Sequence, residues 1–142
     1  MPDDGATQLG EKRREELLDR VSRRTATIGQ SIPETVEVGE ETIELKSFVW
    51  ETKRQGVVPP EYRERVQSVR SRLKRERDRR KERLAEADLT VAEGERLAQS
   101  IVGIDRAITA LKSLKEPDLD EHKHEQTVKS NKRWVSFLDQ LR

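Results

Sequence analysis

The chain has 142 residues, charged side chains at 40% of its positions, and 29 basic against 28 acidic residues, for a net charge of +1. That balance excludes a general attraction to nucleic acid or to a membrane surface, so any such attraction must be local. The absence of cysteine excludes disulfides, thiolate nucleophiles and zinc–cysteine sites. The first residues lack a basic start followed by an apolar stretch, and no run approaches the roughly 20 apolar residues of a membrane span, so we expect a soluble, cytoplasmic protein.

The N-terminal part of the chain predicts a short tail followed by a helix. We expect residues 1–8 to be flexible and residues 9–142 to form one helical domain. Within that domain, residues 9–24 predict the first helix, because apolar side chains recur on one face of an otherwise charged segment. These apolar residues are Leu17, Leu18 and Val21.

The next segment alternates apolar and polar residues around Gly39, which predicts a β-hairpin at about residues 34–46. A two-residue turn at Gly39 and Glu40 would set Val36 opposite Ile43. Because an isolated hairpin is only marginally stable in water, its apolar face needs a helix against it. That face consists of Val36, Val38, Ile43 and Leu45.

Four further helices are expected after the hairpin, beginning with a short one over residues 46–55. Pro60 opens the longest, residues 61–87. Thr90 and Glu93 have the spacing of a capping box, which opens the next helix. That helix and the last one are expected over residues 91–115 and 118–141.

The helix at 91–115 carries the clearest apolar seam of the sequence, with steps of four and three residues. Its members are Leu97, Ile101, Ile104, Ile108 and Leu111. We expect it to pair with the helix at 61–87. The predicted fold class is therefore mainly α, an antiparallel helical hairpin with additional N- and C-terminal helices and a small β-hairpin.

The longest helix has a large excess of positive charge. Residues 61–84 contain 11 basic and 5 acidic side chains, so pairing within this segment leaves six cations unmatched. Arginine occupies the positions on both sides of its apolar seam. Together with one arginine on the outer face, these residues form the candidate interaction surface: Arg63, Arg65, Arg70, Arg72, Arg75, Arg77 and Arg79.

Three interpretations of this surface stay open. Residues 34–51 contain six glutamates and one lysine, so acids of the same chain would neutralise the arginines, and runs of charge commonly serve this structural purpose. In the second interpretation, the partner is an acidic surface of another protein chain. The third partner is the phosphate backbone of RNA or DNA, bound without sequence preference because the helix lacks a recognisable nucleic-acid motif.

No group of residues supports catalysis, a cofactor or a metal. His122 and His124 are two residues apart, so on a helix they point in different directions and do not form a metal site. The serines lack a nucleophile elbow, and the glycines form no phosphate-binding loop. With so few aromatic residues, Trp50 and Trp134 are expected to anchor the core rather than to stack on bases.

These observations predict a protein without enzymatic activity and without a cofactor. We expect a helical interaction module that binds an unknown protein partner or associates with itself, and that does not bind membranes. The alternative function is sequence-independent binding of an RNA or DNA backbone through the arginine-rich helix at 61–87.

Three stretches, "SIPETVEVGEETIELKSFVWETKRQGVVPP", "SIVGIDRAITALKSL" and "NKRWVSFLDQL", resemble a small family of haloarchaeal proteins of unknown function. The resemblance runs from about Glu11 to the C-terminus. It implies an archaeal, salt-adapted protein, and it assigns no activity and no site residue. At molar salt the screening length is about 3 Å, so short bidentate contacts would survive better than long-range attraction.

Overall fold

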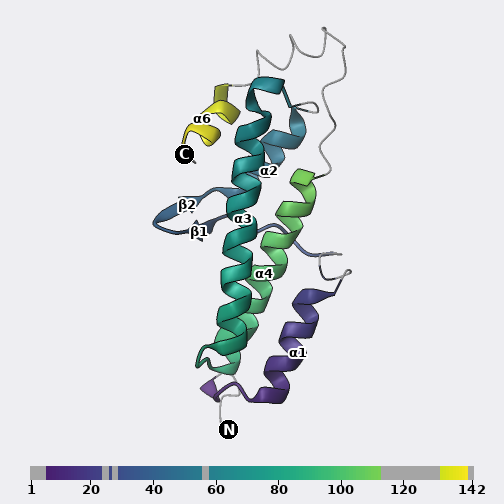
Figure 1. Ribbon diagram of the computed structural model, residues 1–142, viewed down its shortest axis with the longest axis vertical. Coiled ribbons are helices and arrows are strands. Elements are labelled where there is room, and N and C mark those ends of the chain that lie inside the picture. Colours follow the sequence, from purple (N-terminus) through teal and green to yellow (C-terminus); the bar gives the residue numbers. More distant parts are fainter. Residues whose placement is uncertain (1–5, 24–25, 27–28, 56–57, 113–131, 141–142) are drawn as a thin grey trace.

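The computed structural model describes residues 6–23, 26, 29–55, 58–112 and 132–140. The elements in chain order are α1 (Glu11–Ser22), β1 (Val36–Val38), β2 (Glu41–Ile43), α2 (Leu45–Arg54), α3 (Pro60–Glu86), α4 (Val91–Lys112) and α6 (Lys132–Gln140). The protein is thus mainly helical with one small antiparallel sheet, which confirms the predicted fold class. In Figure 1, α3 and α4 run along the long axis, and the hairpin projects from the middle of α3.

A short turn forces α3 and α4 to run antiparallel. Pro60 stands at the first position of α3, and the chain leaves the helix at Ala87, whose backbone is extended. The predicted capping box then opens α4. The backbone N–H of Thr90 donates to the carboxylate of Glu93 at 3.0 Å, and the N–H of Glu93 donates to the Thr90 hydroxyl at 3.2 Å.

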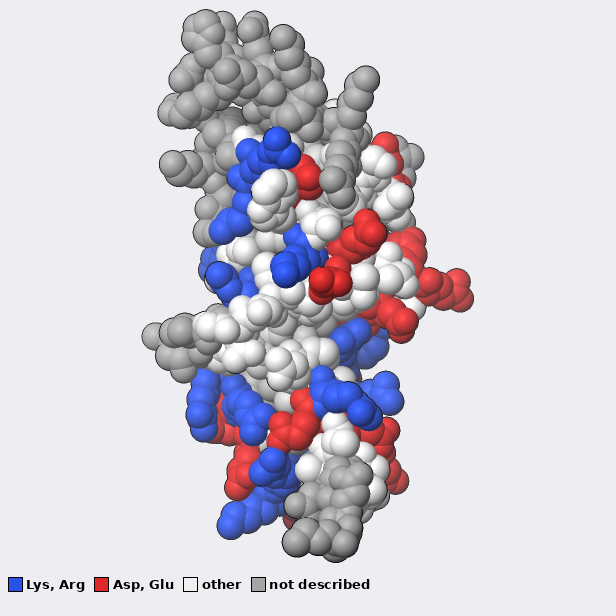
Figure 2. Space-filling view, turned by 180° about the vertical axis from the view of Figure 1, so that it is seen from behind, with Lys and Arg blue, Asp and Glu red and all other residues white. Residues whose placement is uncertain are grey.

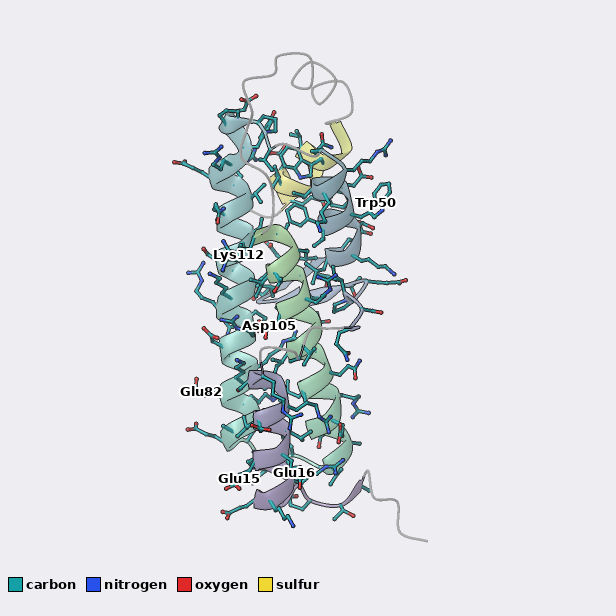
Figure 3. All side chains as sticks on the ribbon, turned by 90° about the vertical axis from the view of Figure 1, so that its right-hand side faces the viewer. Glu15, Glu16, Trp50, Glu82, Asp105 and Lys112 are labelled. Carbon is teal, nitrogen blue, oxygen red and sulfur yellow. The ribbon has the colours of Figure 1, made fainter. Side chains whose placement is uncertain are left out.

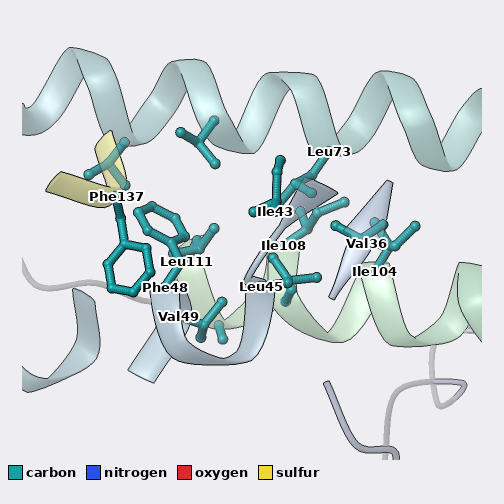
Figure 4. Close-up of a cluster of buried hydrophobic side chains, with 14 of the residues drawn as sticks. Val36, Ile43, Leu45, Phe48, Val49, Leu73, Ile104, Ile108, Leu111 and Phe137 are labelled. Carbon is teal, nitrogen blue, oxygen red and sulfur yellow. The ribbon is translucent and has the colours of Figure 1, made fainter. Parts of the chain in front are cut away.

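The predicted seam of α4 is buried over most of its length. Ile101 and Ile104 are fully buried, whereas Leu97 at the start of the seam is only partly buried. The buried apolar residues that α3 contributes are Val66, Val69, Leu73 and Leu84. Figure 4 shows side chains of α3, α4, the hairpin and α2 meeting in one cluster, with Leu73, Ile104 and Ile43 among them.

The hairpin has the predicted register. Val36 pairs with Ile43 and Val38 with Glu41, so the turn consists of Gly39 and Glu40. Gly39 adopts a φ of +63°, which a residue with a side chain rarely accepts. Val36, Val38 and Ile43 are buried in the larger core cluster, so the apolar face of the hairpin is covered by the helices.

The segment before α1 pairs with the turn between α3 and α4. The N–H of Leu9 donates to the carbonyl of Leu89 at 2.8 Å, and the N–H of Val91 donates to the carbonyl of Thr7 at 2.8 Å. Gln8 forms an isolated antiparallel bridge with Thr90, which lies between these two hydrogen bonds. Residues 7 and 8 thus pair with the turn between α3 and α4, and the flexibility of the tail through residue 8 stays a prediction.

Helix α1 lies beside the lower half of α4 (Figure 1) and stabilises the end of α3. The Arg14 guanidinium donates to the carbonyls of Leu84 at 2.6 Å and of Ala87 at 2.8 Å. These carbonyls belong to the C-terminal turn of α3, where cations are favourable. Leu17 and Val21 of α1 are buried in a second apolar cluster, together with residues of α3 and α4.

Trp134 anchors α6 against α2. Its side chain is fully buried, and its Nε1–H donates to the Thr52 hydroxyl at 2.8 Å. That hydroxyl donates in turn to the carbonyl of Phe48 at 2.7 Å. The rings of Tyr62 and Phe137 complete the contact, since Tyr62 meets Trp134 edge to face and Phe137 meets Phe48 in the same way. The expectation that Trp134 is a core anchor is confirmed.

The last predicted helix is described only in part. Structure is described from Lys132 to Gln140, while the segment 113–131, with His122 and His124, lies outside the described residues. None of the described helices combines the length and the apolar character that a membrane span requires. Within the same residues, no three potential metal ligands gather at one place.

Candidate interaction surface

Four of the seven candidate arginines form ion pairs, and their acidic partners come from four different elements. The pairs are Arg65 with Asp139 of α6, Arg72 with Glu41 of β2 at 3.2 Å, Arg77 with Asp105 of α4 at 2.8 Å, and Arg79 with Glu76 of α3 at 3.5 Å. Three of these four arginines therefore connect α3 to the elements packed around it.

Arg77 is the most completely engaged of them. Burial by itself lowers the pKa of its guanidinium, but hydrogen bonds to Asp105 at 2.8 Å and Asp78 at 3.0 Å outweigh this effect and raise the pKa. Asp105 is itself mostly buried, with 18% of its side chain exposed. The pair thus ties α3 to α4 and is not available to an outside partner.

The remaining three candidates behave differently. Arg63 and Arg75 are exposed, and neither forms an ion pair with the part of the chain that the structure describes. Arg70 donates to the Gln67 side-chain carbonyl at 3.2 Å, while its buried Nε has no hydrogen-bond partner there. Helix α3 therefore keeps exposed cations at Arg63 and Arg75.

The hairpin neutralises less of α3 than its composition suggested. Among the candidates, only Arg72 pairs with a hairpin carboxylate, that of Glu41. Arg80, which was not among the candidates, donates to the backbone carbonyl of Glu37 at 3.1 Å. Figure 2 shows acidic side chains gathered at the edge where the hairpin projects, with basic and acidic side chains mixed below it.

A groove opens where the tip of the hairpin approaches the C-terminal half of α3 and the N-terminal half of α4. We call it the arginine groove. It has a volume of about 570 Å³. The residues that line it are Glu37, Gly39, Glu76, Arg79, Arg80, Arg83, Leu89, Glu93, Arg96, Leu97 and Ser100.

The acids of the arginine groove are largely engaged by the protein itself. Glu76 is buried at 6% exposure and lies 3.5 Å from Arg79 and 3.6 Å from Arg80. The backbone and hydroxyl hydrogen bonds from Thr90 lower the pKa of Glu93, with smaller contributions from the charges of two arginines. The carboxylates at Glu76 and Glu93 thus already have donors.

Two arginines of the groove lack an acidic partner in an ion pair among the described residues. The guanidinium groups of Arg83 and Arg96 are exposed and form no ion pair with any described residue. Arg83 belongs to α3 and Arg96 to α4, and the positive charge of each contributes to lowering the pKa of Glu93. With the apolar side chains of Leu89 and Leu97, they give the groove a mixed cationic and apolar lining.

The candidate surface predicted from the sequence did not include Arg80, Arg83 or Arg96. Arg83 follows Arg79 by four residues, so the arginine flank could have been extended by one turn from the sequence. The sequence contains no comparable spacing that would indicate Arg96, because its position beside α3 depends on how α4 packs.

The expectation that Trp50 anchors the core is wrong. Its side chain is 59% exposed, and Figure 3 shows it at the edge of the molecule, pointing away from the helices. Helix α2 buries the opposite face instead, with Phe48 and Val49 in the larger core cluster. The reason is helical spacing, since Trp50 cannot share a face with both of these residues.

The chain matches the family of unknown function DUF5788 over residues 9–139. It belongs to this family. No curated protein and no solved structure matches the chain. Membership assigns no role to any residue, so functional proposals rest on the arginine groove and on the surfaces described above.

Proposed function

We propose that the protein is a non-enzymatic interaction module that binds an acidic segment of a partner protein in the arginine groove. The observation that carries this proposal is the pair of exposed guanidinium groups at Arg83 and Arg96, which have no ion pair among the described residues and stand beside Leu89 and Leu97. Arginine is enriched at protein interfaces because its planar group binds carboxylates through two hydrogen bonds.

The lining favours a polypeptide over a nucleic acid. Leu97, which is only partly buried, offers apolar contact that phosphates cannot use. The groove also contains the carboxylates of Glu37, Glu76 and Glu93, and a continuous phosphate backbone would pass close to these acids at a cost. A peptide that alternates acidic and apolar side chains can place each beside a suitable neighbour.

Sequence-independent nucleic-acid binding through α3 is the second candidate function. It is favoured by Arg75, Arg79 and Arg83, which stand on successive turns of α3 and are all exposed. Exposed acids lie among them, including Glu82, which weakens this surface for phosphates. Self-association is the other form of the first proposal, and light scattering after size-exclusion chromatography tests it directly.

A cytoplasm with molar salt, which a haloarchaeal origin would imply, fits the groove better than the outer face of α3. The screening length there is about 3 Å, so attraction over longer distances is lost. Contacts between a carboxylate and Arg83 or Arg96 inside the groove are short and persist.

The test uses a fluorescent peptide of alternating glutamate and leucine, and the same peptide with glutamine in place of glutamate. Anisotropy measures binding to the wild-type protein and to Arg83→Glu/Arg96→Glu. The matched control is Arg63→Glu/Arg75→Glu, which makes the same change in charge on exposed arginines outside the groove.

We expect the wild type to bind the glutamate peptide and not the glutamine peptide. The groove variant should lose at least about tenfold in affinity, while the control variant should keep it. An equal loss in both variants would refute a specific groove. Binding of an RNA oligonucleotide that is lost in the control variant would instead favour the second candidate function.

A further inference from the structure

The outward face of α2 combines an exposed tryptophan with three cations. We call it the α2 basic face and define it by Lys46, Trp50, Lys53 and Arg54. Their spacing of four, three and one residues places them together on one side of the helix. Trp50 is the exposed large apolar side chain of the described chain, at 59% exposure.

The cations of this face are not neutralised. Lys46, Lys53 and Arg54 are all exposed, and none forms an ion pair with a described residue. The nearest acids along the chain, Glu44 and Glu51, fall outside the face by helical spacing, and Glu51 is buried. Helix α2 therefore contributes three positive charges and no negative one to this face.

Arg54 also orients the tryptophan. Its guanidinium carbon lies 5.4 Å from the centroid of the Trp50 ring, within the range of a cation–π contact. This contact keeps the ring in a defined orientation beside the cations. The exposed Trp50 ring can stack on a flat aromatic group, and the cations beside it can bind a negative charge. A ligand that contains both groups therefore fits this face.

We propose that the α2 basic face binds single-stranded nucleic acid without sequence preference. A base stacks on Trp50, and the phosphates on either side contact the lysines and Arg54. The proposal goes beyond the interaction module described above, because α2 and the arginine groove lie at different ends of the α3–α4 pair (Figure 1).

Two other kinds of partner fit the face less well. Lysine is depleted at the centres of protein interfaces, yet two of the three cations here are lysines, Lys46 and Lys53. A membrane surface requires a broad apolar helix face, whereas the apolar face of α2 is buried in the core and only Trp50 is exposed. Both partners are included as outcomes of the experiment.

Intrinsic fluorescence provides a direct measurement. Trp134 is fully buried, so a change in the emission of an exposed tryptophan reports on Trp50. Titration with a dodecamer of deoxythymidine at several salt concentrations should quench this emission, because the base stacks on the ring. With three phosphate contacts, log affinity should fall against log salt with a slope of about −2.

Variants separate stacking from charge, with binding followed by the anisotropy of a labelled dodecamer. Trp50→Ala should lower the affinity by roughly five- to 150-fold. Lys46→Gln/Lys53→Gln/Arg54→Gln should flatten the salt dependence by about two units. The matched control removes three cations of α3, in Arg63→Gln/Lys74→Gln/Lys81→Gln, and should leave binding nearly unchanged.

Several results would overturn the proposal. One is the absence of quenching at low salt, and another is unchanged affinity in Trp50→Ala. An equal loss in the α3 control would move the site to α3. A shift of the emission on anionic phospholipid vesicles, or tighter binding of an acidic peptide than of the dodecamer, would assign the face to a membrane or a protein instead. Circular dichroism confirms that each variant is folded.

Discussion

The contact between α6 and α2 can be tested most sharply at Trp134. Its side chain is fully buried, it donates to Thr52 at 2.8 Å, and the Tyr62 ring lies against it with 5.2 Å between centroids. Replacing a buried tryptophan by alanine costs about 3 to 5 kcal/mol of the free energy of unfolding, from lost transfer energy and the cavity left behind. We expect Trp134→Ala to fall in this range.

A double-mutant cycle isolates the hydrogen bond within that contact. Trp134→Phe removes the donor and keeps an aromatic ring, and Thr52→Val removes the acceptor. Urea denaturation followed by circular dichroism gives the free energy of unfolding for both variants and for the double variant. The coupling between the two residues should be about 0.5 to 1.5 kcal/mol, the usual net value of a hydrogen bond between neutral groups.

Two results would refute this reasoning. A cost below about 1 kcal/mol for Trp134→Ala would mean that α6 contributes little to the folded state. A coupling near zero between Trp134 and Thr52 would mean that their hydrogen bond is not made in solution, even if the alanine variant is destabilised. An unchanged free energy of unfolding in Thr52→Val would lead to the same conclusion. That substitution removes both the acceptor for Trp134 and the hydrogen bond that the Thr52 hydroxyl donates to the Phe48 carbonyl.

The remaining predictions concern α4. Ile104→Asp buries an unpaired charge and should abolish the cooperative thermal transition, so an unchanged melting curve would contradict the packing of the helical hairpin. Gly103→Ala places a Cβ 2.8 Å from the Cδ of Pro33 and should cost about 1 to 3 kcal/mol in urea denaturation, whereas a neutral effect would show that the Pro33 segment moves aside. Hydrogen bonds from Thr90 lower the pKa of Glu93 from 4.5, so its stabilising contribution is present above pH 4.5 and is lost as the pH falls through the lowered value. Thermal melts between about pH 6 and pH 2.5 should therefore depend less on pH in Glu93→Gln than in the wild type, and identical profiles would contradict the capping box.

Features that depend on neighbours in the chain could be predicted from the sequence. The seam through Ile101 and Ile104 follows from helical periodicity, and the capping box needs only the spacing of Thr90 and Glu93. The hairpin register follows from alternation around Gly39, which supplies the turn. In each case the interaction that fixes the structure is local, so the pattern of residues is sufficient.

The choice of face on α2 shows where a sequence prediction failed. Trp50 was expected in the core, yet it cannot share one face of the helix with both of its buried neighbours Phe48 and Val49. Helical spacing would have warned that one of them points outward. Packing decided that it is Trp50, because the other two meet residues of α3, α4 and α6 in the larger cluster.

The sequence by itself determined the helices, the hairpin and the surplus of arginine on α3, because each follows from residue type and short-range spacing. Only the tertiary structure decided which arginines are engaged. Arg77 meets Asp105 across 28 positions, and Arg65 meets Asp139 across 74. Such pairs form only after α4 and α6 have packed on α3, since their energies are small compared with the burial of apolar surface that positions the helices. The arginine groove arises in the same way, where packing brings Arg96 and Arg83 together, and neither forms an ion pair with a described residue.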